Sequence, residues 1–265
     1  MEIPIAQVDA FTDTPFRGNP AGVCVLETPR PMEWMQSVAA EMNVAETAFL
    51  EPHADGFGLR WFTPLVEIDL CGHATIASAH ILWETSRLAR SAQARFHTRS
   101  GLLTADRRGA WIELDFPATP SVATEAPAAL APALGVAPKW VGRSRFDYLV
   151  EVDSEETVRR VAPDLKALAT VEARGVIVTA PSASRAYDFV SRFFAPRAGI
   201  DEDPVTGSSH CCLGPYWAAR LGKQEMTAYQ ASTRGGVVRV RLNGDRIALG
   251  GQAITVLRGV LVGTT

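Results

Sequence analysis

Runs of alternating and continuous apolar residues recur along this chain and predict β-strands over most of its length. The first two strands are expected at residues 3–11 and 22–26, joined by a loop dense in Asp, Pro, Gly and Asn. Apolar residues then recur with helical spacing over residues 31–42, which predicts an amphipathic helix. The chain therefore begins with a β unit followed by a helix.

Two later segments are typical of buried helices. Residues 74–84 are apolar on nearly every side, as expected of a helix that a sheet encloses. Residues 208–222 are the second segment, in which Pro215 predicts a kink or the start of a new helix. The other predicted elements are a helix at 155–162 and strands at 46–50, 59–62, 95–98, 101–106, 111–116, 147–152, 175–179, 187–194, 236–242, 246–250 and 254–261.

One short pattern occurs twice, half a chain apart. Residues 60–64 read RWFTP and residues 192–196 read RFFAP, an offset of 132 (192 − 60), and each leads to a small-residue turn before a buried helix. The turn glycines, Gly72 and Gly207, differ by 135 (207 − 72), so the second copy carries a three-residue insertion. The repeat predicts two copies of one structural unit.

Strands around one buried helix, repeated once, predict an α+β fold of two pseudo-symmetric halves. Each half is expected to be a mostly antiparallel, barrel-like sheet wrapped around a central helix. We expect the halves to cover residues 1–116 and 125–249, with a last strand, near 250–265, that is free to pack back on the first half. Residues 117–137, rich in Ala and Pro, form the predicted linker.

Composition narrows the functional classes. With 47% hydrophobic and 21% charged residues the chain is globular, and no segment approaches the ~20 apolar residues of a membrane span. A net charge of −3 with scattered Lys and Arg gives no electrostatic footprint for nucleic acid. The N-terminus lacks a secretory signal, and four cysteines are too few for a disulfide framework. We therefore expect free thiols, a cytoplasmic location, and neither a membrane nor a nucleic-acid partner.

Each small-residue turn leads into the first turn of a predicted helix, where backbone N–H groups are available to bind an anion. Gly72 stands at the first such start, and Gly207 and Ser208 stand at the second. Two anion sites facing each other across a cleft would hold a small acidic molecule from both ends. The expected partner is a small anionic metabolite.

Glu46 is the one ionisable residue within residues 44–50. Apolar neighbours favour the uncharged form of a carboxylic acid, which is what a general acid/base working near neutral pH requires. The alternative is that strand alternation points Glu46 to solvent.

His73 and Asp203 stand at the two turns. The positive end of the following helix disfavours an imidazolium at His73, which predicts a neutral ring, and stabilises a carboxylate at Asp203. Structural roles remain open for both, a cap for His73 and an N-cap or Asx turn before Pro204 for Asp203.

Cys71 precedes Gly72 as a proton-transferring thiol would, but Thr206 stands at the matching position of the second copy. A two-thiol mechanism requires a thiol in both copies. A zinc site can also be drawn from these residues: Cys71, His73, His80, His210, Cys211 and Cys212. No C-x-x-C or H-x-x-x-H spacing supports it, so we predict no metal. The glycine-rich signatures of nucleotide sites are absent from the sequence as well.

Four short motifs follow one another along the chain: residues 18–23 (GNPAGV), 45–49 (AETAF), 71–75 (CGHAT) and 202–208 (EDPVTGS). Together they resemble the phenazine-biosynthesis isomerase (PhzF-like) family, which is related in fold to diaminopimelate epimerase. The resemblance covers nearly the whole chain. It implies two similar halves with the active site between them, and a homodimer.

The resemblance also implies cofactor-free proton transfer, in which a glutamate takes a proton from one carbon of a small acid and returns it at another position. Carried over by motif, Glu46 is similar to that acid/base, and His73 and Asp203 to the polar partners that position the substrate. The implied substrate-binding residues are Gly72, Gly207, Ser208, Asn19 and Cys71.

Two positions depart from the family pattern. Ala45 stands where the phenazine enzyme has a hydroxyl residue, and Cys71 stands where it has a small residue, so the resemblance does not imply the phenazine precursor as substrate. Cys71 also matches a catalytic thiol position of the epimerases. Two alternatives therefore stay open, an amino-acid epimerase or racemase that uses Cys71 and a non-catalytic protein that binds small acids.

Overall fold

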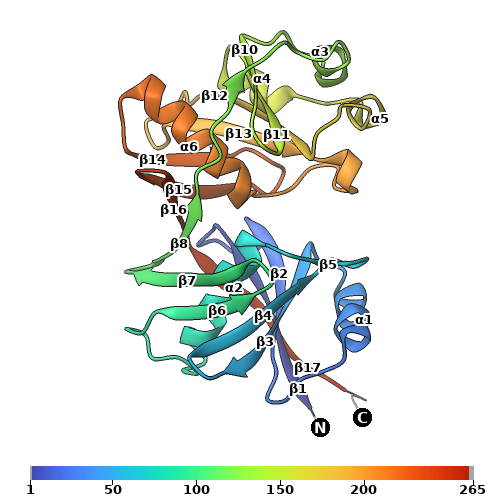
Figure 1. The fold of residues 1–265 in the computed structure, drawn as a ribbon, viewed down its shortest axis with the longest axis vertical. Coiled ribbons are helices and arrows are strands. Elements are labelled where there is room, and N and C mark those ends of the chain that lie inside the picture. The colour runs from blue at the N-terminus through green and yellow to red at the C-terminus, as the bar shows by residue number, and fades with distance from the viewer. Residues whose placement is uncertain (1, 263–265) are drawn as a thin grey trace. The chain divides into compact units, whose positions relative to one another are not determined.

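The computed structural model describes residues 2–262. The chain forms two compact units, unit 1 from Met1–Asp115 with Gly250–Thr265 and unit 2 from Phe116–Leu249 (Figure 1). Each unit has a hydrophobic core of its own. None of the described helices combines the length and the apolar character that crossing a membrane requires.

Unit 1 is a mostly antiparallel sheet with one central helix. Its elements are β1 (Ile3–Ala10), β2 (Asn19–Val25), α1 (Met32–Met42), β3 (Glu46–His53), β4 (Gly56–Phe62), β5 (Glu67–Ile68), α2 (Gly72–Glu84), β6 (Ala94–Thr98), β7 (Gly101–Arg108), β8 (Trp111–Pro117), which runs on into unit 2, and β17 (Ala253–Leu261). β1 pairs antiparallel with β17 and β2, β2 pairs parallel with β3, and β3 pairs antiparallel with β4. The first and last strands of the chain therefore lie side by side (Figure 1).

The central helix α2 is buried because its residues are small or apolar around the whole circumference. It packs against β1, β2, β3 and β17, and its one carboxylate, Glu84, stands at its end. Ser86, with a φ of 58°, then turns the chain out of the helix. The prediction of an enclosed helix at residues 74–84 is confirmed.

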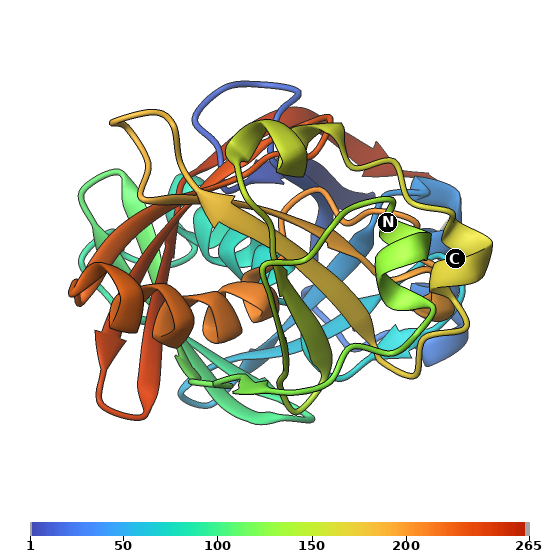
Figure 2. The same cartoon turned by 90° about the horizontal axis from the view of Figure 1, so that it is seen from above.

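Unit 2 repeats this pairing pattern. Its elements are β9 (Val122–Ala123), α3 (Leu130–Leu134), β10 (Trp140–Arg143), β11 (Asp147–Glu151), α4 (Glu155–Arg160), α5 (Leu165–Leu168), β12 (Gly175–Pro181), β13 (Phe189–Phe194), the 3-10 turn η1 (Pro196–Ala198), α6 (Gly207–Leu221), β14 (Glu225–Gln230), β15 (Gly236–Asn243) and β16 (Arg246–Gly251), which runs back into unit 1. β11 pairs parallel with β12, and β12 pairs antiparallel with β13, as β2, β3 and β4 do in unit 1. The helix α6 packs against β14 and β15 (Figure 2). The predicted fold class, α+β with a repeated half, is confirmed.

A partly buried ion pair recurs in both copies of the repeat and locates the insertion. Arg60 donates to both carboxylate oxygens of Glu67 at 2.7 and 2.8 Å, and Arg192 does the same to Glu202 at 2.7 and 2.9 Å. The two arginines are 132 residues apart, whereas the two glutamates are 135 apart (202 − 67), like the turn glycines. The three extra residues therefore lie before Glu202, in the segment that contains η1.

Two local predictions for unit 2 are wrong, the linker at residues 117–137 and a new helix start at Pro215. Residues 117–137 are more than a linker, because they form β9 and α3, and Leu130 and Leu134 of α3 lie in the core. α6 also continues through Pro215 without a new start. Proline removes the N–H that would bond the carbonyl four residues earlier, and the N–H of Thr119 donates to that carbonyl, of Cys211, at 3.0 Å instead.

Candidate active site

The predicted site residues fall into two groups, one in each unit. Unit 1 holds Asn19, Glu46, Cys71, Gly72 and His73, and unit 2 holds Asp203, Gly207 and Ser208.

The unit 1 group is assembled by two strand starts and one helix start. Parallel pairing aligns Ala21 of β2 with Glu46 of β3, so Asn19 and Glu46 begin neighbouring strands. Cys71 and His73 stand at the start of α2, which packs on both strands. All four side chains are buried, and Glu46 thus lies in the interior rather than on the solvent face.

Glu46 and His73 form a buried ion pair. Oε2 of Glu46 lies 3.0 Å from Nε2 of His73, and the two side chains are only 10% and 7% exposed. A buried carboxylate costs free energy unless a partner compensates it, and His73 is that partner. The two atoms are close without being aligned for a hydrogen bond, so Oε2 accepts none from the described residues. A lone pair of this oxygen is therefore available for a proton from a substrate.

The charge state of His73 differs from the predicted neutral ring. Burial alone would lower the pKa of His73, but its contacts with Cys71 and with the Glu46 carboxylate raise that pKa well above its ordinary value. The prediction is wrong because a carboxylate at 3.0 Å outweighs the partial charge of a helix end.

The second ring nitrogen of His73 faces Asn19 and Cys71. Nδ1 lies 3.2 Å from Nδ2 of Asn19 and 3.5 Å from Sγ of Cys71. An imidazolium donates from both nitrogens, so its Nδ1–H needs an acceptor, either the Cys71 sulfur or the Asn19 amide turned to present its oxygen. Asn19 and Cys71 therefore orient the ring that Glu46 contacts.

Cys71 is a thiol rather than a thiolate. Burial, with a smaller contribution from the charge of Glu46, raises the pKa of Cys71 to about 11. Because the thiolate is the nucleophilic form, this environment does not prepare Cys71 for attack or proton abstraction at neutral pH.

The first turn of α2 presents backbone N–H groups beside this pair. The N-cap residue Cys71 is extended, with φ −144° and ψ 112°, and no described side chain caps the helix. N–H groups at an uncapped helix start, here at Gly72 and His73, favour an anionic ligand. An anion site and a buried acid/base pair thus share His73.

The unit 2 group surrounds the start of α6. Asp203 is half-buried, and its Oδ2 accepts a hydrogen bond from the Thr206 hydroxyl at 2.5 Å. Thr206 is the extended N-cap residue, again with no cap from a described side chain, and Gly207 and Ser208 are the first two residues of the helix. Asp203 is therefore not the N-cap that its position allowed.

Gln230, at the end of β14, holds this turn in place and was missed by the sequence reasoning. Its Nε2 donates to the carbonyl of Asp203 at 2.7 Å, and its Oε1 accepts from the N–H of Thr206 at 2.9 Å. The side chain is fully buried. A lone uncharged amide at the end of a strand was the only sequence signal for this role.

Comparisons with known proteins identify the family of this chain. The family model described as "Phenazine biosynthesis-like protein" (PhzC-PhzF) matches residues 8–259. The chain belongs to this family. A protein of Halalkalibacterium halodurans named as an uncharacterized isomerase is 56% identical over 263 residues, 99% of each chain. "Phenazine biosynthesis-like domain-containing protein 2" of mouse is 42% identical over 287 residues, 98% of this chain and 99% of the mouse protein.

Solved structures show the same family. A PhzF-family phenazine biosynthesis protein of Enterococcus faecalis superposes with a TM-score of 0.95 at 40% identity, covering 98% of this chain and 99% of that one. A probable proline racemase of Agrobacterium radiobacter is similar in fold alone, with a TM-score of 0.66 at 13% identity over 99% and 93% of the two chains. Family membership supports an isomerase at a coarse level, as the names of the relatives indicate.

The residues drawn for a zinc site do not form one cluster in this PhzF-family chain. Glu46, Cys71 and His73 offer ligand atoms within 4.8 Å of one another, but His80 instead contacts the Thr255 hydroxyl at 3.1 Å. Burial lowers the pKa of His210, in unit 2, to about 4, and its Nδ1 donates to the Thr206 carbonyl at 2.7 Å.

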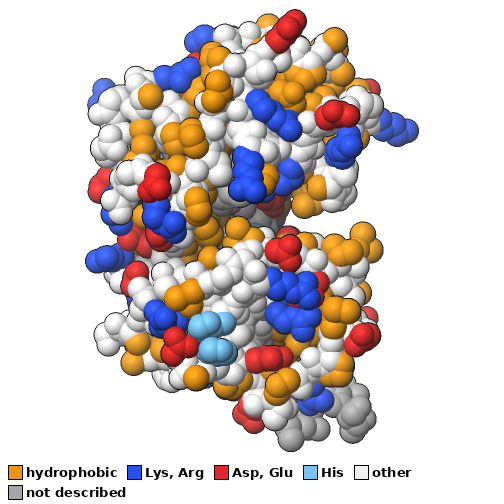
Figure 3. All heavy atoms as spheres, in the orientation of Figure 1, with side chains coloured by type: hydrophobic (Ala, Val, Ile, Leu, Met, Phe, Trp, Pro, Cys, Tyr) orange, Lys and Arg blue, Asp and Glu red, His pale blue; other side chains and the backbone are white. Residues whose placement is uncertain are grey.

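A second group of possible ligands lies on the surface of unit 1, in His53, Asp55 and His97. Figure 3 shows histidine side chains exposed on that unit. The absence of a metal from the reaction stays a prediction.

Proposed function

We propose that this PhzF-family member is an isomerase that moves a proton between two positions of a small carboxylate-bearing metabolite by general acid/base catalysis without a cofactor. Glu46 is the proposed acid/base. The observation that carries the proposal is the buried Glu46–His73 pair beside the uncapped first turn of α2.

The proposed reaction uses each part of that arrangement. The substrate carboxylate binds the N–H groups at the start of α2, which places a neighbouring C–H bond at Oε2 of Glu46. Glu46 accepts the proton, the C–H electron pair delocalises into the substrate as an oxyanion, and the imidazolium of His73 and the backbone N–H groups stabilise that charge. Glu46 then returns a proton at a second carbon, so atoms and charges balance, and in D₂O it returns a deuteron whenever the acid has exchanged with solvent before the return.

The unit 2 group is proposed to serve the same substrate, in a cleft between the halves. The N–H groups of Gly207 and Ser208 would bind its second polar end. Asp203, held by Thr206 and Gln230, would position that end. A homodimer in the cytoplasm is part of the proposal.

The two alternative functions, an epimerase or racemase and a non-catalytic binding protein, require different properties of the site. An epimerase or racemase that uses Cys71 needs a thiolate, whereas the pKa of this thiol is raised to about 11. Its counterpart in unit 2 is Thr206, which carries no thiol. A non-catalytic protein would bind the same acids without exchanging their protons.

Hydrogen exchange in D₂O tests the proposal. Candidate acids are incubated with the protein, and deuterium on carbon is read by mass spectrometry. We expect Glu46→Gln to slow exchange by about 10²- to 10⁴-fold, the range of a lost general base. Glu51→Gln, on the same strand but half-buried, is the matched control and should exchange at the wild-type rate. Wild-type exchange by Glu46→Gln would refute the role of Glu46, and binding without exchange would favour the non-catalytic alternative.

A further inference from the structure

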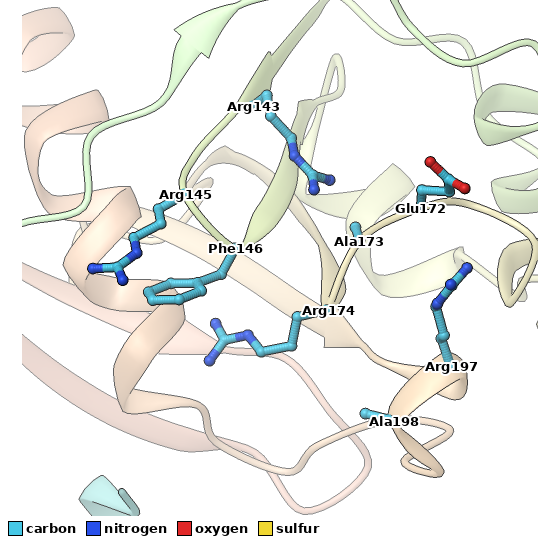
Figure 4. A pocket seen from close by; sticks show the side chains of 8 residues that line it. All are labelled: Arg143, Arg145, Phe146, Glu172, Ala173, Arg174, Arg197 and Ala198. Atoms are coloured by element: carbon cyan, nitrogen blue, oxygen red, sulfur yellow. The ribbon is translucent and has the colours of Figure 1, made fainter. Parts of the chain in front are cut away.

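Unit 2 contains a cavity of about 620 Å³ that the proposed reaction does not use. Four arginines line it, together with Phe146 and Glu172: Arg143, Arg145, Arg174 and Arg197 (Figure 4). They come from β10 and the turn that follows it, the residue before β12, and η1. Segments more than 50 residues apart in the chain thus bring like charges together.

The charges of this cavity do not cancel. Arg174 forms a double hydrogen bond with the buried carboxylate of Asp147. Among the described residues no carboxylate forms an ion pair with Arg143, Arg145 or Arg197, and Glu172 is the one acidic residue in the lining. The cavity is therefore cationic in a chain whose net charge is −3.

Aromatic rings hold three of the four guanidinium groups. That of Arg143 lies 4.4 Å from the centre of the Tyr148 ring, and those of Arg145 and Arg174 lie 5.0 and 5.1 Å from the centre of the Phe146 ring. Stacking on a ring leaves the N–H edges of a guanidinium available, so little order is lost when an anion binds.

Arg143 supplies a second sign of a missing ligand. Its Nη1 is buried and finds no hydrogen-bond partner among the described residues. A buried donor on a charged group costs free energy while it stays unsatisfied, and an anionic ligand would remove that cost.

Strand register relates one edge of this cavity to the strand start that carries the proposed acid/base in unit 1. Pairing of β11 with β12 aligns Asp147 with Gly175, as pairing of β2 with β3 aligns Ala21 with Glu46. Gly175 thus replaces Glu46, and the neighbouring Arg174 replaces Ala45. A Cβ at Gly175 would lie 2.3 Å from the Phe193 ring, so this position excludes a side chain. The equivalent strand start in unit 2 therefore carries no acid, and a cation precedes it.

We propose that this cavity binds a phosphate anion with two or more negative charges, such as a di- or triphosphate. Planar arginine forks match phosphate oxygens bidentately, and three guanidinium groups without ion pairs suit a ligand with several charged oxygens. Two guanidinium groups lie at the ring of Phe146, which is still 39% exposed, so its exposed part is the contact open to a nucleobase, and the phosphate belongs either to a nucleotide or to a ligand without a base.

Calorimetric titration of the full chain with pyrophosphate tests the site. The double variant Arg143→Gln/Arg197→Gln removes two guanidinium groups that make no ion pair. We expect it to bind pyrophosphate about tenfold or more weakly than wild type, as the loss of charge-assisted hydrogen bonds implies. Arg160→Gln/Arg185→Gln, which removes two exposed arginines of unit 2 outside the cavity, is the matched control and should bind as wild type does. Thermal unfolding checks that all variants are folded.

The other outcomes are equally decisive. No binding by wild type, equal binding by the cavity variant, or citrate binding as tightly as pyrophosphate would overturn the proposal. ATP binding more tightly than pyrophosphate, with the gain lost in Phe146→Leu, would identify a nucleotide. Equal affinities for ATP and pyrophosphate would support a phosphate ligand without a base.

Discussion

The starts of α2 and α6 share one backbone design and carry different chemistry. Each has an extended N-cap residue, Cys71 or Thr206, without a cap from a described side chain. Four residues later, Thr75 in one helix and His210 in the other donate to the N-cap carbonyl, at 2.6 and 2.7 Å. The scaffold that presents backbone N–H groups is thus kept in both units, while the side chains around it have diverged.

The divergence is largest at the start of the parallel strand beside each helix. Unit 1 has Glu46 there, paired with His73, whereas unit 2 has Gly175, and Ser208 takes the helix position of His73. One unit therefore carries the proposed proton-transfer pair, and the other carries hydroxyl groups and Asp203. A single acid/base on one side is what directional proton transfer requires, whereas racemisation by two bases requires matched groups on both.

The largest effect on stability is expected from adding a side chain at Gly175, the position in unit 2 that is equivalent to Glu46. Gly175→Ala places a Cβ 2.3 Å from the Phe193 ring, which must move within a packed core. We expect a loss of about 1–3 kcal/mol in the free energy of unfolding, measured with urea. Gly58→Ala in β4 is the control, since its Cβ meets only ordinary contacts at 3.9 Å or more. Equal stabilities of the two variants would show that Gly175 is not sterically required.

Removing the repeated arginines compares the stabilisation by two ion pairs, Arg60–Glu67 in unit 1 and Arg192–Glu202 in unit 2. Arg192→Met should destabilise the protein by about 2 kcal/mol and Arg60→Met by about 1 kcal/mol, because Arg192 is less exposed and also donates to backbone carbonyls such as that of Val161. Urea unfolding measures both, and a larger effect at Arg60 would contradict the ranking.

The Arg60–Glu67 ion pair also predicts that the free energy of unfolding depends on pH. The hydrogen bond from Arg60 lowers the pKa of Glu67, so this stabilisation is present above the unfolded pKa, near 4.5, and is lost as pH falls through the lower folded value. Arg60→Met should flatten the stability profile in that acidic range. An unchanged profile would show that the pair does not contribute.

The two buried histidines should titrate in opposite directions. His73 has a raised pKa, so the stability it contributes is complete below about 6.5 and is lost as pH rises through the folded value. His210 has a pKa lowered to about 4, so stability is lost as pH falls from about 6.5 towards that value. NMR titration of the ring protons, assigned with His73→Gln and His210→Gln, measures both. A neutral His73 ring at pH 6.5 would contradict the ion pair with Glu46.

The smallest effect on the D₂O exchange rate is expected from replacing Cys71. Since the pKa of Cys71 is about 11, Cys71→Ser should change the D₂O exchange rate only a few-fold, and iodoacetamide should modify the folded protein slowly at neutral pH. Loss of exchange comparable to that of Glu46→Gln would instead make Cys71 a proton-transfer group and favour the epimerase alternative.

The sequence predicted the parts of this molecule that depend on local pattern. Strands of alternating or continuous apolar residues, such as β1 and β15, and the all-round apolar α2 are recognisable because burial imposes a periodicity on neighbouring residues. The polar site residues were found for a different reason, since the motifs around Glu46, His73 and Asp203 match a family pattern.

The failures share a cause in distant contacts. α6 continues through Pro215 because Thr119, nearly 100 residues away, satisfies the carbonyl that the proline leaves open. Gln230 escaped notice because its partners, Asp203 and Thr206, precede it by more than 20 residues. No local pattern reports a hydrogen bond of this kind.

The sequence by itself determined the repeat, the two helix starts and the family. Tertiary structure decided which carboxylate faces which histidine, that His73 favours the charged ring, and that four arginines scattered over residues 143–197 line one cavity. The physical reason is range: side-chain periodicity and turn chemistry act over a few residues, whereas charge state and electrostatic potential depend on groups that only folding brings within a few ångströms.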